Sequence, residues 1–331
     1  MKKLLATLAA TTVLSVAASG AFAAKYELRL STVVNDPHPW TEAAFQMAKE
    51  VEEKTKGEVK ITVFEGGSLG SDAAAIDQMR MGSVDFVVGG TTNAARVAPE
   101  FGVFSLSYLF ENMDQFKRAM DPASPVVKQL KETISDRGMG FELLALGGGG
   151  TRTFSNNRRP INSVEDIKGL KMRVPGAKAD ALMWSELGAL PTSMPFTEVY
   201  SAIQTGVVDS FESTISSFSS SKFYEVAKYH ALTNHQIMTT HISGSSATMN
   251  RLPDEYAAIV REAANNAGKV ITEAGERFDA EVLATLPSKG VTVTTVDTAP
   301  FAAKLVSLHE EIAEDAGYPE ILALIRESNA K

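Results

Sequence analysis

The most informative candidate for chemistry is an arginine at the end of a predicted strand. Arg173 lies in the run GLKMRVP, residues 169–175, in which Leu170 to Val174 reads as a strand before a proline. Ligands of open α/β sheets bind beyond the carboxyl ends of the strands. An arginine there can hold a carboxylate through two parallel, charge-assisted hydrogen bonds. A surface salt bridge also explains such an arginine, so position alone leaves both interpretations open.

A second candidate is a serine in a hydrolase-like motif. The run GGSLG, residues 66–70, matches the nucleophile elbow G-x-S-x-G with Ser68 at its centre. In that elbow the serine sits at the turn from strand to helix. Here the predicted helix begins only at Ser71 or Asp72, both good N-caps, so Ser68 falls in the loop. We therefore favour a tight turn and keep an exported serine hydrolase as an alternative.

Thiol and metal chemistry find little support. The chain has no cysteine, which excludes thiol catalysis, disulfides and cysteine-ligated metal sites. The histidines form neither an H-E-x-x-H motif nor a local cluster of two histidines and a carboxylate. Gly147 to Gly150 lacks the lysine and hydroxyl of a phosphate loop. We expect no catalytic residue, no metal and no cofactor. The five histidines are His38, His230, His235, His241 and His309.

Length and charge limit the class of protein. The chain has 331 residues, 44% of them apolar, which is enough for about two domains of roughly 150 residues. Its formal net charge of −8 argues against a nucleic-acid partner, because such proteins rely on a positive surface.

The first residues have the three parts of a secretory signal peptide. A positive start, Met1-Lys2-Lys3, precedes an apolar stretch from Leu4 to Val16 and the A-x-A site Ala21-Phe22-Ala23. The apolar stretch is short for a membrane anchor, and no later segment approaches 18 apolar residues. We predict cleavage after Ala23 and a soluble protein free in the periplasm.

The elements that position these residues form two similar groups. The first has predicted strands at 26–31, 59–64 and 84–88, with helices at 40–54 and 73–81 between them. The second has strands at 170–174 and 207–211 and helices at 179–187 and 196–204. Both groups contain Gly-x-Val-Asp where a helix passes into a strand, at 82–85 and 206–209. The pattern predicts two similar α/β lobes.

Two further segments connect these lobes. Gly147 to Gly150 follows the predicted strand 141–146 and reads as a flexible crossing between the lobes. Residues 254–286 carry apolar residues three or four apart and no proline before the end of the run, which predicts one long amphipathic helix that braces both lobes. Shorter helices are expected at 301–313 and 320–328.

Over nearly the whole mature length, the chain resembles the substrate-binding subunit of tripartite ATP-independent periplasmic (TRAP) transporters, the dicarboxylate-binding-protein-like DctP family. The sequence segments that carry this resemblance include GLKMRVP at 169–175, LGALPTSMPFTEVYSAIQTGVVDSFES at 187–213 and KFYEVAKY at 222–229. LGSDAAAIDQMRMGSVDF at 69–86 and RPINSVEDIKGLKMRVP at 159–175 fit the same family.

The resemblance implies a set of binding residues in the second lobe. It makes Arg173 the arginine that grips a carboxylate, and it places Arg152 where many members have a second arginine facing the ligand. Phe196 matches an aromatic wall of the cleft. Glu212 and Ser213 occupy a strand end that varies with the ligand; sialic-acid binders have asparagine at the Ser213 position, which argues against sialic acid.

In the first lobe, the resemblance directs two segments toward the cleft. The loop 35–40 offers His38 as a hydrogen-bond donor and Trp40 as an aromatic surface, and the segment 90–93 offers Thr91 and Asn93. His38 and Trp40 can equally pack beneath their own loop.

The expected fold is the two-lobe periplasmic binding protein clamshell of the α/β class, with the long helix bracing both lobes. Residues 24–149 with 237–277 are expected to form lobe I, and 150–236 with 278–331 lobe II, after a signal peptide at 1–23. The hinge is expected near 147–150 and 233–236.

The predicted function is capture of a small organic anion and its delivery to the membrane subunits of a TRAP transporter, without chemistry on the solute. A monomer is expected. The alternatives are the Ser68 hydrolase and a sensory protein that binds a ligand. The ligand itself stays open among monocarboxylates, C4-dicarboxylates, sugar acids, keto acids and sulfonates.

Overall fold

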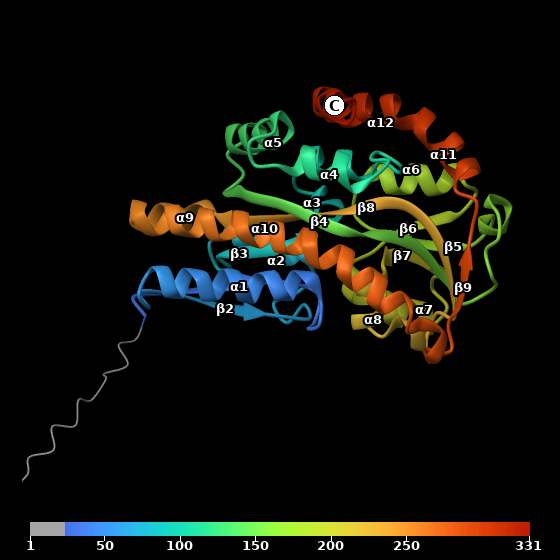
Figure 1. Ribbon diagram of the computed structural model, residues 1–331, viewed down its shortest axis with the longest axis horizontal. Helices are drawn as coiled ribbons and strands as arrows, with labels where there is room; N and C mark the ends of the chain where they lie inside the picture. The colour runs from blue at the N-terminus through green and yellow to red at the C-terminus, as the bar shows by residue number, and fades with distance from the viewer. Residues whose placement is uncertain (1–23) are drawn as a thin grey trace, which may run out of the picture.

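The computed structural model describes residues 24–331, and within them one continuous sheet passes through both halves of the molecule (Figure 1). The strand order is β2-β1-β3-β8-β4-β7-β5-β6, and β9 pairs with β8. We call the half that contains β1 to β3 the first lobe and the half that contains β5 to β7 the second lobe. The predicted signal peptide lies outside the described residues.

The first lobe forms where the sequence alternates between strands and capped helices. Helix α1 buries Ala43, Ala44, Met47 and Val51 on one face, and Ser71 caps α2 by accepting the backbone N–H of Ala74. The elements here are β1 (Tyr26–Ser31), α1 (Pro39–Lys54), β2 (Val59–Phe64), α2 (Asp72–Arg80), β3 (Phe86–Gly90), α3 (Thr91–Ala94), the 3₁₀ helix η1 (Pro99–Ser105), α4 (Met113–Met120) and α5 (Pro125–Asp136).

The second lobe repeats this plan with three parallel strands. Strand β5 pairs with β6 on one side and with β7 on the other. Its elements are η2 (Val164–Ile167), β5 (Lys171–Val174), α6 (Lys178–Glu186), β6 (Leu190–Ser193), η3 (Phe196–Glu198), α7 (Val199–Gln204), β7 (Ser210–Thr214), α8 (Ile215–Ser220) and η4 (Phe223–Glu225).

Two long antiparallel strands, β4 (Phe141–Asn156) and β8 (Tyr229–Ser245), join the lobes as a ribbon. Strand β3 lies antiparallel to β8 and ends with Gly90 opposite Thr240. Strand β7 lies antiparallel to β4 and ends with Thr214 opposite Arg152. Thr240 and Arg152 both lie near the middle of the ribbon, so the carboxyl ends of the two sets of parallel strands point toward each other there.

The predicted bracing helix is α10 (Asp254–Leu283), which follows α9 (Ser246–Arg251). It packs along β4 and contacts α1 of the first lobe and α8 of the second (Figure 1). The approach is so close that a Cβ on Gly147 would lie 2.3 Å from the carbonyl oxygen of Gly268. A Cβ on Gly275 would likewise lie 2.4 Å from the Gly149 backbone, so glycine is required on both sides of this contact.

Several expected elements differ from the structure. The strands expected at 84–88 and 207–211 begin later, at Phe86 and Ser210, and the helix expected at 196–204 begins as the 3₁₀ turn η3. The glycine run 147–150 is not a loop: β4 continues through it to Asn156, because pairing with β8 extends the strand, with register shifts near the run. The helix expected at 301–313 is divided by a 3₁₀ turn. The C-terminal elements are η5 (Leu286–Lys289), β9 (Thr292–Thr295), α11 (Ala299–Leu305), η6 (Val306–Leu308), α12 (His309–Ala316) and α13 (Pro319–Asn329).

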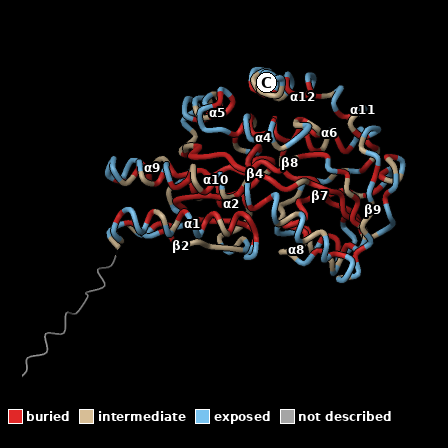
Figure 2. The backbone as a smooth tube through the Cα atoms, in the orientation of Figure 1, coloured by how far each residue is buried: buried red, intermediate tan, exposed pale blue. Residues whose placement is uncertain are grey.

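The two-lobe α/β fold is thus as predicted, whereas the residue boundaries of the lobes stay a prediction because sheet and C-terminal helices span both. Helix α11 packs on α6, and α13 packs on α4 and α5. The ribbon β4–β8 is buried along nearly its whole length, with helices on the outside (Figure 2). Among residues 24–331 we find no helix long and apolar enough to cross a membrane.

Candidate functional site

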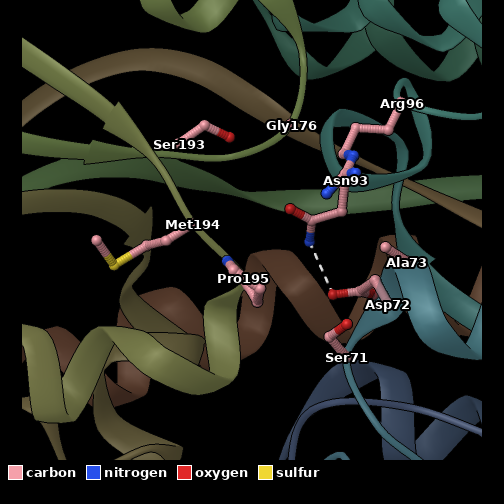
Figure 3. Close-up of a pocket in the computed structure, with 9 residues that line it drawn as sticks. All are labelled: Ser71, Asp72, Ala73, Asn93, Arg96, Gly176, Ser193, Met194 and Pro195. Carbon is pink, nitrogen blue, oxygen red and sulfur yellow. Dashed lines mark hydrogen bonds between the residues drawn. The ribbon is translucent and has the colours of Figure 1, made fainter.

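Two neighbouring cavities lie where the strand ends of the lobes face each other. The first, which we call the arginine cavity, is lined by Arg152 and Arg173 among others. The second, the adjoining cavity, is lined by Asp72, Arg96 and Ser193 among others (Figure 3). Asn93 lines both, so the two cavities meet at its side chain.

The lining residues follow the carboxyl ends of six parallel strands. In the first lobe, Val33 and Val34 follow β1, Asp72 follows β2 and Asn93 follows β3. The second lobe contributes from the ends of β5, β6 and β7 in the same way. This is the position at which open α/β sheets bind their ligands. The second-lobe residues include Arg173, Pro175, Ser193, Met194, Phe196, Ser213 and Ser217.

Arg173 is buried, forms no salt bridge with another described residue and keeps an unused hydrogen-bond donor. The side chain is 1% exposed, and its Nε donates to the backbone oxygen of Met194 at 3.0 Å. Its Nη2 is buried and has no hydrogen-bond partner in the described chain. The guanidinium carbon lies 5.8 Å from the centre of the Phe196 ring, a cation–π distance. Burial lowers the pKa of Arg173 to about 10, so the group stays cationic at neutral pH and keeps a donor for an anion.

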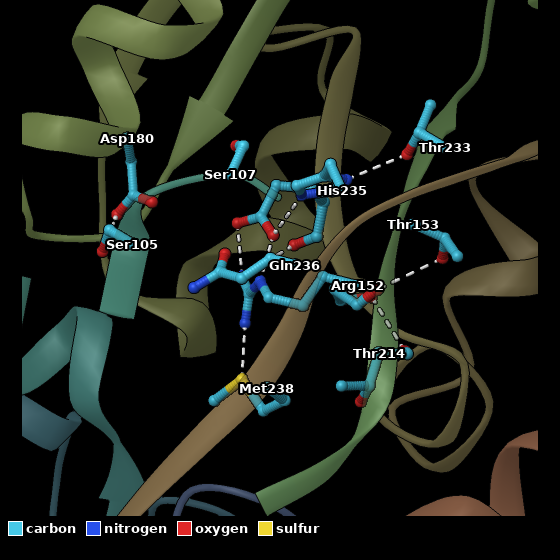
Figure 4. A network of polar contacts seen from close by, with 12 residues as sticks. Ser105, Ser107, Arg152, Thr153, Asp180, Thr214, Thr233, His235, Gln236 and Met238 are labelled. Carbon is cyan, nitrogen blue, oxygen red and sulfur yellow. Dashed lines mark hydrogen bonds and ion pairs between the residues drawn. The ribbon is translucent and has the colours of Figure 1, made fainter. Parts of the chain in front are cut away.

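Arg152 is instead neutralised by an internal partner (Figure 4). Its Nε and Nη2 donate to the two carboxylate oxygens of Glu212, and its Nη1 lies 2.9 Å from the sulfur of Met238. His235 lies 3.5 Å from the same carboxylate. Burial raises the pKa of Glu212, but the charge of Arg152 outweighs it and holds that pKa at about 2. Arg152 therefore lines the cavity with its charge largely balanced by Glu212 behind it.

A buried carboxyl forms the first-lobe side of the adjoining cavity. Asp72 accepts a hydrogen bond from the Asn93 amide at 2.9 Å, while its second oxygen, Oδ1, is buried without a hydrogen-bond partner among residues 24–331 (Figure 3). Burial raises the pKa of Asp72 to about 7, although the charge of Arg173 opposes this rise. The carboxyl can therefore exchange a proton near neutral pH.

The structure separates the other predicted site residues into two groups. Phe196, Ser213, Trp40 and Asn93 line the arginine cavity, together with both arginines. Three others have their polar groups occupied within the protein. Glu212 pairs with Arg152, Thr91 Oγ1 donates to the backbone oxygen of Thr239, and His38 lies beneath its loop against Trp40 and Ser217.

The lining residues that the sequence analysis did not single out as site residues include Asp72, Ser217 and Met238. For Asp72 a signal existed, since it begins the capped helix that follows the end of β2. Ser217 and Met238 lie in runs without a motif. Two histidines are held by neighbouring hydroxyls: His235 Nδ1 lies 2.9 Å from Thr233 Oγ1, and His241 Nδ1 lies 2.9 Å from Ser243 Oγ. Within the described chain no three His or acidic side chains are grouped to hold a metal ion.

Comparison with known proteins identifies the family of this chain. The family model for bacterial extracellular solute-binding proteins, family 7 (DctP), matches residues 30–315. The chain belongs to this family. The sialic acid-binding periplasmic protein SiaP of Vibrio cholerae is 30% identical over 282 residues, which cover 85% of this chain and 87% of that protein.

Two solved structures of TRAP periplasmic solute-binding proteins share the fold. One, from Sulfitobacter sp. NAS-14.1 with bound β-D-galacturonate, is 31% identical with a TM-score of 0.84 and covers 92% of this chain and all of that one. The other, from Roseobacter denitrificans with bound β-D-glucuronate, is 31% identical with a TM-score of 0.84 and covers 92% and 99%.

The predicted family and the main predicted function, a periplasmic solute-binding protein that captures a small organic anion for a TRAP transporter, are thereby confirmed. Neither alternative function gains support. The cleavage site after Ala23 stays a prediction.

Proposed function

We propose that this DctP-family protein binds a sugar acid, a hexuronate or a related polyhydroxylated carboxylate, between its lobes. The proposal rests chiefly on two cavities that share Asn93 as a lining residue and differ in the chemical groups they offer. One offers the free Nη2 of Arg173 to a carboxylate, and the other offers Asp72, Asn93 and Ser193 to hydroxyl groups. The uronates bound by the Sulfitobacter and Roseobacter relatives have both features.

The available interactions are sufficient for useful affinity. A micromolar dissociation constant corresponds to about −8.2 kcal/mol, and each hydrogen bond to a charged group contributes about 1.5–3 kcal/mol. A carboxylate on Arg173, hydroxyls on Asp72 and Asn93, and a ring packed on Trp40 and Phe196 supply this order of energy after the costs of association are met.

The protein is proposed to release its solute unchanged to the membrane subunits of the transporter, as a monomer. Ser68 is proposed to have only a structural role in the turn before α2, without a part in catalysis. It is exposed, its backbone N–H donates to the oxygen of Glu65, and helix α2 begins four residues later, after the N-cap Ser71. A nucleophile elbow would place the serine directly between strand and helix.

Closure of the lobes on the solute is proposed to bend the ribbon near 147–150 and 233–236. Its register shifts between Gly148 and Thr151, and Asn234 has a positive φ of 42°. Such irregular strand segments absorb dihedral changes more readily than regular pairing.

A thermal-shift panel tests the ligand class. D-Glucuronate and D-galacturonate are expected to raise the melting temperature of residues 24–331 by several degrees, because ligand at 100 times its dissociation constant adds about 2.7 kcal/mol. D-Glucose, which lacks the carboxylate, and succinate, which lacks the hydroxyls, are expected to shift it far less. A large shift with succinate and none with any sugar acid would contradict the proposed class.

Affinity for a sugar acid is also expected to depend on pH through Asp72. Above a pKa of about 7 this carboxyl becomes an anion near Arg173 and opposes a bound carboxylate, so affinity falls as pH rises. A carboxyl with a pKa of about 7 is about three-quarters ionised at pH 7.5 and almost wholly protonated at pH 5.5, so a loss of affinity of about 3- to 4-fold over this range is expected.

Calorimetry of the wild type and Asp72→Asn across this range measures the effect. The variant keeps the size of the side chain and is expected to give a flat profile. An equally steep profile in Asp72→Asn would assign the titration to another group.

A further inference from the structure

A histidine of the first lobe reaches a serine of the second across the cleft. His38 precedes α1, is 2% exposed, and its Nε2 lies 3.0 Å from Ser217 Oγ at the start of α8. Its Nδ1 accepts the backbone N–H of Trp40 at 3.1 Å. Burial lowers the pKa of His38 to about 3, so the ring is neutral and carries one hydrogen. Because Nδ1 is an acceptor, that hydrogen is on Nε2 and is donated to Ser217.

A second donor reaches the same serine from its own lobe. Thr214 Oγ1 lies 2.9 Å from the hydroxyl oxygens of both Ser216 and Ser217; when the Ser216 hydroxyl donates to Thr214, the single Thr214 hydrogen is donated to Ser217. The Thr214 hydroxyl in turn accepts the backbone N–H of Ser217 at 3.1 Å. Ser217 Oγ therefore accepts two hydrogen bonds, one from each lobe, which occupies both of its lone pairs. Its own hydrogen is left, and Ser217 lines the arginine cavity beside Arg173 and Ser213.

We propose that Ser217 donates its hydroxyl hydrogen to an oxygen of the bound sugar acid. We further propose that His38, from the opposite lobe, fixes the orientation of this hydroxyl group by donating to its oxygen. The hydroxyl of a serine rotates freely unless its lone pairs are occupied. The His38 contact exists only where the lobes meet, so the oriented donor is complete only in the closed protein. His38 is then a positioning residue that couples closure to recognition. This inference rests on the proposed function, since it needs an oxygen-rich solute in the arginine cavity.

We call the chain of hydrogen bonds from His38 through Ser217 to the solute the relay. A double-mutant cycle tests it, with D-glucuronate as the probe in calorimetry. Ser217→Ala and His38→Ala are each expected to weaken binding by up to about tenfold, the loss of one well-oriented hydrogen bond. The double variant is expected to bind within about twofold of Ser217→Ala, because His38 acts only through that serine. Losses that multiply in the double variant would overturn the relay.

Two further variants keep the test decisive. If His38→Ala does not fold, His38→Phe retains the ring volume without a donor and is expected to show the same tenfold loss. His38→Gln can supply an amide N–H to Ser217 and is expected to bind within about threefold of the wild type; a tenfold loss in this variant would count against the relay.

His230 provides a matched control. It is also buried and bonded to hydroxyls, those of Thr153 and Ser155, but none of these three residues lines either cavity. His230→Gln is expected to change stability and to leave the dissociation constant within about twofold; a tenfold loss of affinity here would assign the His38 effect to general disturbance and overturn the relay.

Failure of the wild type to bind D-glucuronate or D-galacturonate would overturn the proposed function and the relay together, whereas normal wild-type binding with multiplicative losses would overturn the relay alone.

Discussion

Arg173→Ala is expected to weaken binding of a sugar acid by at least about a hundredfold, and Arg173→Lys by about tenfold or more. Arg173 is almost wholly buried, and its Nη2 has no hydrogen-bond partner among the described residues. Removing one member of a buried, hydrogen-bonded charge pair costs about 2–5 kcal/mol of binding energy, and a hundredfold change corresponds to about 2.7 kcal/mol. Lysine keeps the charge but loses the planar fork.

Calorimetry with the best sugar acid of the thermal-shift panel measures both variants. Arg158→Lys is the matched control, because this arginine of the same lobe is 59% exposed and pairs with Asp209 away from the cavities. It is expected to bind as the wild type does. Wild-type affinity in both Arg173 variants would remove this arginine from the site.

Glu212→Ala is expected to lower the free energy of unfolding by about 3–5 kcal/mol. The change leaves the buried guanidinium of Arg152 without its counter-charge, and an uncompensated buried charge carries a penalty of this size. The carboxylate is 1% exposed and lies inside the sheet rather than on a cavity wall. Stability rather than ligand contact is therefore its main expected contribution.

Urea denaturation of the ligand-free protein measures this loss. Glu142→Ala is the control, since the pair of Glu142 with Arg261 is partly exposed and such pairs contribute less than about 1 kcal/mol. A stable Glu212→Ala that fails to bind sugar acids would instead support the direct ligand contact that the family resemblance implies.

Much of the fold could be predicted because its elements are locally encoded. Strands β1 and β2 lie where the alternation of apolar residues placed them, and α2 begins after the N-cap Ser71. Strand β8 had no such signal, since its interior carries buried polar residues such as Thr239, Thr240 and His241. Its pairing with β4 joins residues about 90 positions apart, a relation that no local pattern records.

The sequence predicted those site residues whose place at the end of a strand indicates contact with a ligand. Arg173 follows from its strand end, and the family motif adds Phe196 and Asn93 to the same cleft. The partner of an arginine is a tertiary property, so the sequence did not distinguish the unpaired Arg173 from Arg152, which Glu212 neutralises. The contact between His38 and Ser217 joins residues 179 positions apart and exists only because the lobes meet.

The most direct test of the account is a crystal structure of residues 24–331 with the sugar acid that stabilises it best. The account predicts the solute between the lobes, its carboxylate about 3 Å from the guanidinium nitrogens of Arg173 and its hydroxyls toward Asp72 and Asn93. A sugar acid bound outside the two cavities, or one whose carboxylate lies away from Arg173, would contradict it.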